Sequence, residues 1–197
     1  MSKRVEFFFD LGSPASYLAW TQLPRICAEH GAQLVLRPML LGGVFQATGN
    51  NSPAMIPAKG RYFFKDLHRY ARRYGVPLTF NEHFPINTLG LMRAAVGVQL
   101  RQPQRFEAWL ETMYRAMWAE GRNLGDPAVV AQVLEEGGFE AGGFAALVSD
   151  PEVKSALKAA TDEAVSRGVF GAPSCFVGDE MFFGQDRLEF VVEALKG

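Results

Sequence analysis

The first forty residues place a helical apolar pattern between two alternating ones, which predicts a strand, a helix and a second strand. Residues 5–9 form a short, mostly apolar β-rich run, 18–27 repeat apolar positions at helical spacing, and 33–37 alternate again. Turn-forming residues 10–14 follow the first strand, and Gly31 ends the helix. Because a connection through a helix of this length favours parallel strands, we expect a right-handed βαβ unit.

From Leu41 to about Arg167 the pattern becomes helical, with turns rich in Gly, Pro and Asn. After Arg167 it returns to β character, with strands at 174–177 and 181–183 and a final helix that ends at Lys196. The helices expected in the middle block are 59–74, 88–99, 103–118, 127–136, 144–148 and 151–167.

The order of elements is therefore βαβ, a helical block, and ββα. Neither terminal unit can bury its apolar strands alone, so we expect the two units to form one sheet. The predicted fold class is α/β, with a thioredoxin-like βαβ…ββα sheet interrupted by a large all-helical insertion.

Composition and charge narrow the class of protein. Hydrophobic residues at 48% and charged residues at 21% indicate a globular chain rather than a disordered one. The net charge is −1 and Lys and Arg are spread along the chain, so neither nucleic acid nor a membrane surface is expected as a partner. No apolar run approaches the roughly 18 residues that cross a bilayer, and the first apolar stretch is too short for a signal peptide. We therefore expect a cytoplasmic protein.

The two cysteines, Cys27 and Cys175, lie far apart in sequence and in no metal-ligand spacing. In a reducing compartment such cysteines are expected to be buried small apolar residues rather than a disulfide. No metal site is expected.

Ser13 lies between the first predicted strand and helix, in the segment Gly12-Ser13-Pro14-Ala15-Ser16. It occupies the N-cap position, and Pro14 occupies the first helical position. One interpretation is that Ser13 only satisfies a free backbone N–H. The other is that its hydroxyl and the positive end of the helix stabilise an anion, such as a thiolate. Thioredoxin-type proteins carry Cys-x-x-Cys here, so in this chain the thiol would have to come from another molecule.

Two later segments also carry candidate chemistry. Ala172-Pro173 precedes the third strand, where a proline is often only a strand boundary. An X-Pro bond can also be cis, which would turn the Ala172 backbone outward to pair with an extended thiol peptide. Gln185 and Asp186 precede the last helix. There Asp186 either caps or complements the helix dipole, or helps that helix end to bind the charged groups of a γ-glutamyl unit.

These residues and their spacing resemble the kappa-class glutathione transferases and, more closely, the bacterial 2-hydroxychromene-2-carboxylate isomerases. The resemblance runs almost end to end and keeps six motifs in order. The motifs are 8–14, 49–59, 65–67, 75–77, 170–173 and 178–187, of which the last is the most specific.

The resemblance implies a site built from both terminal units. Ser13 would contact the glutathione sulfur, and Ala172, before a cis Pro173, would bond the cysteinyl backbone. Asp186, together with Gln185, would hold the γ-glutamyl end.

The resemblance also places Asn50 and Lys59 near glutathione and the substrate pocket. A cation at Lys59 would suit a substrate carboxylate, whereas the alternative is a solvated lysine in the first turn of a helix. The family often has an aromatic residue where this chain has Ala15, a departure that bears on the shape of the pocket beside Ser13.

By the same resemblance, residues 1–44 and 166–197 form a thioredoxin-like glutathione-binding domain. Residues 45–165 form a helical insertion domain that supplies the substrate pocket. The implied cofactor is glutathione, the implied ligand is a small aromatic or electrophilic substrate, and the implied assembly is a homodimer.

Three functions fit these features. In a glutathione-dependent isomerase, the resemblance implies that the thiolate adds to an unsaturated aromatic keto acid, a bond rotates, and elimination returns glutathione. A kappa-like transferase or peroxidase would instead consume glutathione. A non-catalytic thioredoxin-like module would capture extended peptides at Ala172-Pro173. The missing Cys-x-x-Cys disfavours a disulfide oxidoreductase.

Overall fold

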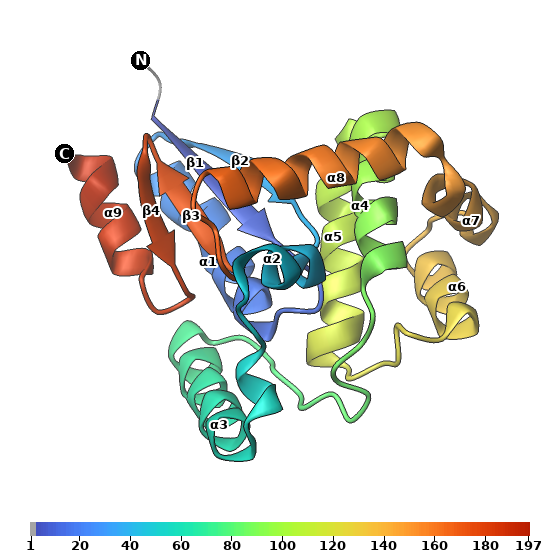
Figure 1. Cartoon of the computed structure of the whole chain (residues 1–197), viewed down its shortest axis with the longest axis horizontal. Coiled ribbons are helices and arrows are strands. Elements are labelled where there is room, and N and C mark those ends of the chain that lie inside the picture. The colour runs from blue at the N-terminus through green and yellow to red at the C-terminus, as the bar shows by residue number, and fades with distance from the viewer. Residues whose placement is uncertain (1–2) are drawn as a thin grey trace.

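The two terminal units of the chain share one sheet. The computed structural model describes residues 3–197, so residues 1–2 of the expected 1–44 segment lie outside the described part. The strands are β1 (Arg4–Phe9), β2 (Gln33–Pro38), β3 (Ser174–Val177) and β4 (Glu180–Phe183). They form a four-stranded sheet in the order β2-β1-β3-β4 (Figure 1). β1 is parallel to β2 and antiparallel to β3, and β3 is antiparallel to β4. The predicted fold class and the parallel βαβ unit are therefore confirmed.

β1 is buried on both faces, which accounts for its nearly continuous apolar sequence. Successive side chains of a strand point to opposite faces of the sheet. Phe7 and Phe9 accordingly join the main core, while Phe8 joins a second, smaller cluster with Phe176 of β3.

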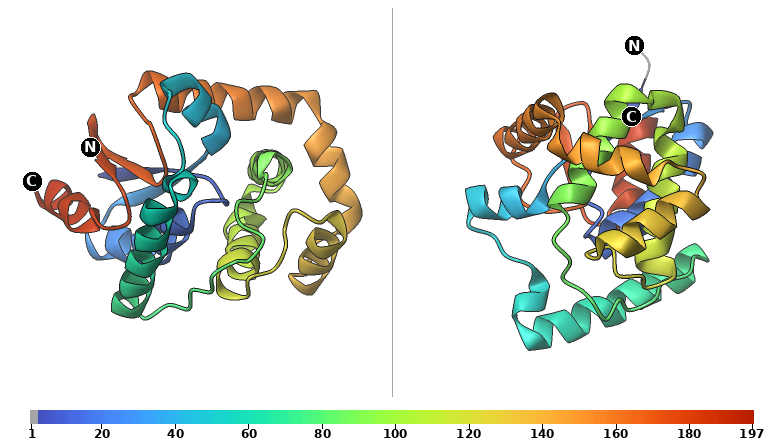
Figure 2. Two further views of the ribbon diagram at one scale, coloured as in Figure 1. Left: turned by 60° about the horizontal axis from the view of Figure 1, so that its bottom comes forward. Right: turned by 90° about the vertical axis from the view of Figure 1, so that its right-hand side faces the viewer.

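Helices from both ends of the chain cover the face of the sheet that holds the main core. These are α1 (Pro14–Glu29) and α9 (Leu188–Lys196), which contact each other (Figure 2). The other face is covered by α2 (Leu41–Thr48) and by the end of α8 (Pro151–Ser166), which supply Val44 and Ala164 to the smaller cluster.

The long segment between β2 and β3 is built of helices and loops, and α8 leads back from it to the sheet (Figure 1). Within residues 3–197, no helix combines the length and hydropathy needed to cross a bilayer. Besides α2 and α8 the segment contains α3 (Pro57–Tyr74), α4 (Leu89–Arg101), α5 (Phe106–Tyr114), α6 (Pro127–Glu136), α7 (Ala141–Ser149) and 3-10 turns at Pro53–Met55 and Pro103–Arg105.

The helix expected over 103–118 is divided in the structure. It starts with the 3-10 turn at Pro103–Arg105, continues as α5, and ends in a π-helical turn at Arg115–Ala119. A π-turn shifts the hydrogen bonds by one residue, but the buried positions continue at helical spacing from Met113 and Tyr114 to Met117 and Trp118. For that reason apolar periodicity alone did not separate the three pieces.

A buried ion pair joins the end of α8 to the sheet. Glu6 in β1 is 6% exposed, and its carboxylate lies 3.1 Å from the Arg167 guanidinium and 3.3 Å from that of Arg4. The Arg167 guanidinium also stacks over Phe176, 3.9 Å from the ring centroid. Burial opposes ionisation of Glu6, but the hydrogen bond and charge of Arg167 and the charges of Arg4 and Arg37 outweigh it and lower the pKa of the carboxyl group.

Replacing Glu6 with Gln should lower the free energy of unfolding at pH 7 by about 1–3 kcal/mol, because the Arg167 guanidinium loses its charged partner. Since the folded state lowers the pKa of Glu6, its contribution is complete above the ordinary value of 4.5 and is lost as the pH falls through the lower folded value. Urea unfolding at pH 7 and pH 3 measures both effects. The stability gap between wild type and Glu6→Gln should narrow in acid, and an equal gap at both pH values would contradict this account.

Candidate functional site

Ser13 caps helix α1, as the sequence predicts. Its Oγ accepts the Ser16 N–H at 3.1 Å, and Pro14 occupies the first helical position. The first turn of α1 contains no acidic side chain, so the positive end of the helix is not offset within the helix. The Ser13 hydroxyl also donates to the Ala172 carbonyl at 3.2 Å, and this contact joins the two ends of the chain.

The loop that presents Ser13 is fixed by Asp10. The Asp10 carboxylate accepts the Gly12 N–H and the Leu41 N–H, each at 2.8 Å, and the Asp10 carbonyl accepts the Ser13 N–H at 3.0 Å. Burial raises the pKa of Asp10, while its hydrogen bonds from Leu41, Gly12 and Thr88 oppose that rise. Asp10 is a functional candidate that sequence reasoning missed. The signal for it was its position at the end of the apolar run of β1, where a polar side chain is buried.

The Ala172-Pro173 bond is cis, as the resemblance implies. The Ala172 carbonyl accepts from Ser13, and the Pro173 carbonyl accepts the Gly184 N–H at 2.9 Å. Through these bonds the turn before β3 contacts both the start of α1 and the segment that follows β4.

Gln185 and Asp186 lie next to this turn. Gln185 is buried, and its carbonyl accepts the Tyr74 hydroxyl of α3 at 2.5 Å. Burial, followed by the neighbouring Tyr70, raises the pKa of Tyr74 to about 12, so Tyr74 is a neutral donor.

Asp186 does not cap the last helix, which corrects one of the two expected roles. α9 begins at Leu188 with Arg187 as its N-cap residue and no side-chain cap bond. Asp186 instead forms an ion pair with Arg187, and both side chains remain partly exposed. The Asp186 carboxylate is therefore accessible to a ligand at the mouth of the site.

Asn50, which follows α2, contacts the segment that leads into the cis-proline turn. Its Nδ2 donates to the Phe170 carbonyl at 2.8 Å, three residues before Pro173. The structure thus brings Ser13, Ala172, Gln185 and Asn50 to one group of turns.

Lys59 lies outside this hydrogen-bonded group, in the first turn of α3. It lines a mainly apolar pocket of ≈ 430 Å³ together with Ala58, Tyr62, Phe63 and Asp66. A cation at the rim of such a pocket can attract a carboxylate.

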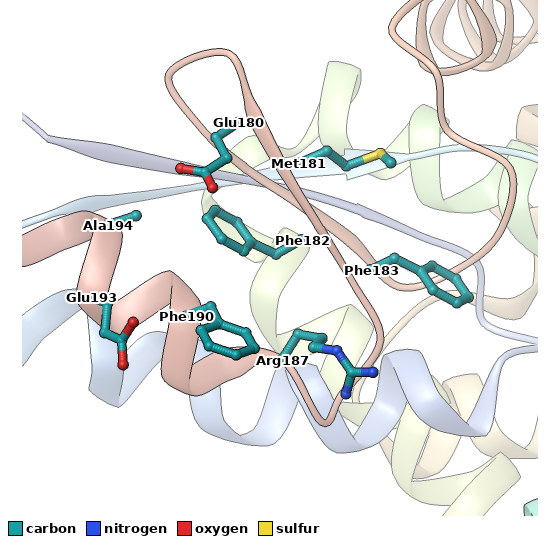
Figure 3. Close-up of a pocket in the computed structure, with 8 residues that line it drawn as sticks. All are labelled: Glu180, Met181, Phe182, Phe183, Arg187, Phe190, Glu193 and Ala194. Atoms are coloured by element: carbon teal, nitrogen blue, oxygen red, sulfur yellow. The ribbon is translucent and has the colours of Figure 1, made fainter.

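A larger pocket of ≈ 570 Å³ lies between β4 and α9 (Figure 3). Phe182 and Phe190 lie near each other in it, with Arg187 toward one end and Glu180 toward the other. It contains none of the residues expected to bind glutathione, so size alone does not locate the candidate site.

Trp118 supports the loop before Ser13 and was not assigned to the site from the sequence. Its indole N–H donates to the Leu11 carbonyl at 2.7 Å. Its ring contacts Phe84, and Phe84 contacts Phe64 of α3 edge to face. An aromatic chain therefore runs from the Ser13 loop toward the pocket that Lys59 lines.

The cysteines of this chain are poor candidates for the reacting thiol. Cys27 and Cys175 are both buried and form no disulfide. Burial raises the pKa of Cys27 to about 11 and also raises that of Cys175. Because the thiolate is the reactive form, neither is a strong nucleophile at neutral pH. Within residues 3–197, no group of His, Cys, Asp or Glu could hold a metal ion.

The chain is similar to known proteins in sequence and fold. The family described as "DSBA-like thioredoxin domain" matches residues 4–196. The chain is 32% identical over 194 residues to a 2-hydroxychromene-2-carboxylate isomerase of Sphingobium xenophagum, covering 97% of both chains. It is 30% identical to glutathione S-transferase kappa 1 of Rattus norvegicus, covering 97% of this chain and 90% of the relative.

A solved structure agrees with these sequence relatives. The structure of a 2-hydroxychromene-2-carboxylate isomerase superposes with a TM-score of 0.85 at 30% identity, covering 98% of this chain and 94% of that one. The chain therefore belongs to the DSBA-like thioredoxin-domain family, and within it to the group of 2-hydroxychromene-2-carboxylate isomerases and kappa-class glutathione transferases.

Proposed function

We propose that this protein is a glutathione-dependent isomerase of the 2-hydroxychromene-2-carboxylate isomerase type. The observation that carries the proposal is the contact of the Ser13 hydroxyl, at the start of α1, with the Ala172 carbonyl beside the cis Pro173. This contact places a helix start that can stabilise an anion beside a backbone segment that could pair with a peptide.

The residues present suit two of the three units of glutathione. The Ala172 backbone can pair with the cysteinyl unit, and Asp186 can bind the γ-glutamyl amino group. The buried Gln185 backbone, held by Tyr74, keeps the turn between these two contacts in place.

The Ser13 proton has a defined route to the sulfur. The Ser13 hydroxyl now donates it to the Ala172 carbonyl, which is also the acceptor that a cysteinyl N–H would need. When that N–H takes the carbonyl, the Ser13 hydroxyl is free to turn toward the sulfur while its Oγ still accepts the Ser16 N–H. Binding and thiolate stabilisation would therefore occur together, and Ser13 would act as a donor rather than as a nucleophile.

When bound, glutathione supplies a thiolate that can add reversibly to an unsaturated carbon. The pocket at Lys59 is suited to a flat substrate with a carboxylate, because its walls include Tyr62 and Phe63. The chain of rings from Trp118 to Phe64 continues this apolar wall toward Ser13.

A kappa-like transferase is the second candidate, supported by the 30% identity to the rat enzyme. The two activities differ in thiol balance. A turnover assay on conjugated aromatic keto acids, with free thiol measured in parallel, separates them. The isomerase requires turnover with constant thiol, whereas a loss of one thiol per turnover would establish the transferase instead.

Ser13→Ala should reduce glutathione-dependent turnover by roughly 10- to 150-fold, because a charge-assisted hydrogen bond to the thiolate contributes about 1.5–3 kcal/mol. The free energy of unfolding should fall by only about 1 kcal/mol, as for a lost N-cap. Asp126→Ala is the matched control, since Asp126 caps α6 in the insertion by accepting the Ala128 N–H. It should lose similar stability and keep its activity. Wild-type turnover in Ser13→Ala would remove Ser13 from the mechanism.

Lys59→Met should raise the KM for a carboxylate-bearing substrate about fivefold with little change in kcat, because an exposed ion contact contributes roughly 1 kcal/mol. Lys65→Met is the control, since Lys65 is exposed on the same helix and does not line the pocket. Steady-state kinetics with the acid and its methyl ester measure the effect. An equal KM change for acid and ester would show that Lys59 does not bind the carboxylate.

A further inference from the structure

Asp10 is a buried carboxylate directly beneath the first turn of α1. It is 1% exposed, and the influences on its pKa are burial and hydrogen bonds, with no basic side chain of the described residues among them. A buried carboxylate is normally paired with a cation. Here the charged form of Asp10 must be stabilised by groups other than a basic side chain.

Those groups lie at three converging helix starts. Asp10 accepts the Gly12 N–H before α1 and the N–H of Leu41, the first residue of α2. It also bonds the hydroxyl of Thr88, the N-cap residue of α4. Each helix start carries a partial positive charge, so these contacts favour the ionised carboxylate and oppose the rise in pKa that burial causes.

The helix starts that hold Asp10 include the one that would hold the thiolate. A carboxylate beneath α1 offsets part of the positive potential that reaches Ser13. Gly12 allows the Asp10 carboxylate to lie close to the start of α1. A Cβ at this position would lie 2.9 Å from the Thr88 methyl carbon and 3.3 Å from the Asp10 carboxylate.

Among the described residues, the other groups around Asp10 add no positive charge to that of the helix starts. From α5 it faces the Tyr114 hydroxyl, whose pKa is raised well above its ordinary value by burial and then by the charge of Asp10. The hydroxyls of Tyr114 and of Ser16 in α1 are buried without a hydrogen-bond partner. The contacts from α2 and α4 are the Leu41 N–H and the Thr88 hydroxyl, which do not titrate in this range.

We propose that Asp10 is a positioning residue whose buried carboxylate fixes the Gly12-Ser13 turn and limits how strongly α1 stabilises an anion beside Ser13. The inference rests on the proposed glutathione site and deepens it. Its consequence is a thiolate of intermediate stability, which stays more nucleophilic than one with a strongly lowered pKa and is a better leaving group than one with an ordinary pKa.

Two glutathione analogues test the charge coupling without any reaction. Glutathione sulfonate carries a permanent negative charge at the sulfur position, and S-methylglutathione carries none there. Asp10→Asn removes one negative charge at nearly constant size. It should increase the affinity for the sulfonate about tenfold relative to S-methylglutathione, measured by calorimetry. Loss of loop geometry alone would weaken both ligands and leave their affinity ratio unchanged.

Asp179 provides the control substitution for Asp10→Asn. Asp179→Asn removes a charge from the exposed turn between β3 and β4 and should leave the ratio unchanged. If both analogues bind and Asp10→Asn leaves their ratio as in the wild type, the inference fails and the glutathione site stands. If neither analogue binds the wild-type protein, the proposed function fails and the inference with it.

A measurement on the wild-type protein covers the case in which Asp10→Asn does not fold. Coupling between two charges is reciprocal. If the Asp10 charge weakens sulfonate binding about tenfold, then bound sulfonate must raise the pKa of Asp10 by about one unit. Carbon-13 NMR of the Asp10 carboxyl should show a pKa about one unit higher with the sulfonate than with S-methylglutathione. Equal values in the two complexes would overturn the inference.

Discussion

The antiparallel pairing of β1 with β3 is the constraint on which the site depends. Its register aligns Phe8 with Ser174, so the end of β1 lies beside the start of β3 although more than 160 residues separate them. The parallel partner β2 also ends at this edge, with Phe9 opposite Pro38, and β4 ends there with Phe183 opposite Ser174. The loops that carry Ser13, Leu41, the cis-proline turn and Gln185 are therefore neighbours because of strand direction alone.

At this edge, backbone groups provide most of the electrostatics. The contacts of Ser13, Asp10 and Ala172 use backbone N–H groups, carbonyls, the Ser13 hydroxyl and the Asp10 carboxylate, and the described residues contribute no metal cluster. Such a site suits a ligand that brings its own reactive group and presents a peptide backbone. The buried cysteines agree with this division of roles, since the raised pKa of Cys27 keeps the chain's own thiol out of the chemistry.

Local patterns predicted the parts of the fold and site that depend on local physics. The strand–helix–strand opening, the capping role of Ser13 and the four strands follow from periodicity, turn residues and cap preferences. The site contacts that were missed join residues distant in sequence to backbone carbonyls, such as Tyr74 to Gln185 and Asn50 to Phe170. A carbonyl is present at every residue, so its partner leaves no signal in side-chain identity. The expected cap at Asp186 is wrong because α9 begins at Leu188, which leaves Arg187 in the N-cap position and Asp186 one residue before it.

The position of the insertion has a functional consequence. Because β2 ends at the site edge, the insertion begins there with α2, and its α4 returns to the same edge at Thr88. The insertion thus supplies the pocket at Lys59 and also two of the three helix starts that hold the Asp10 carboxylate. A change of sequence that moves the start of α2 or α4 would alter the contacts of Asp10 and, on the inference above, the charge environment of Ser13. The pocket itself lies on the 3-10 turn and α3, which follow α2 directly in the chain. If the proposed function holds, one insertion therefore contributes both to substrate binding and to the electrostatic setting of Ser13.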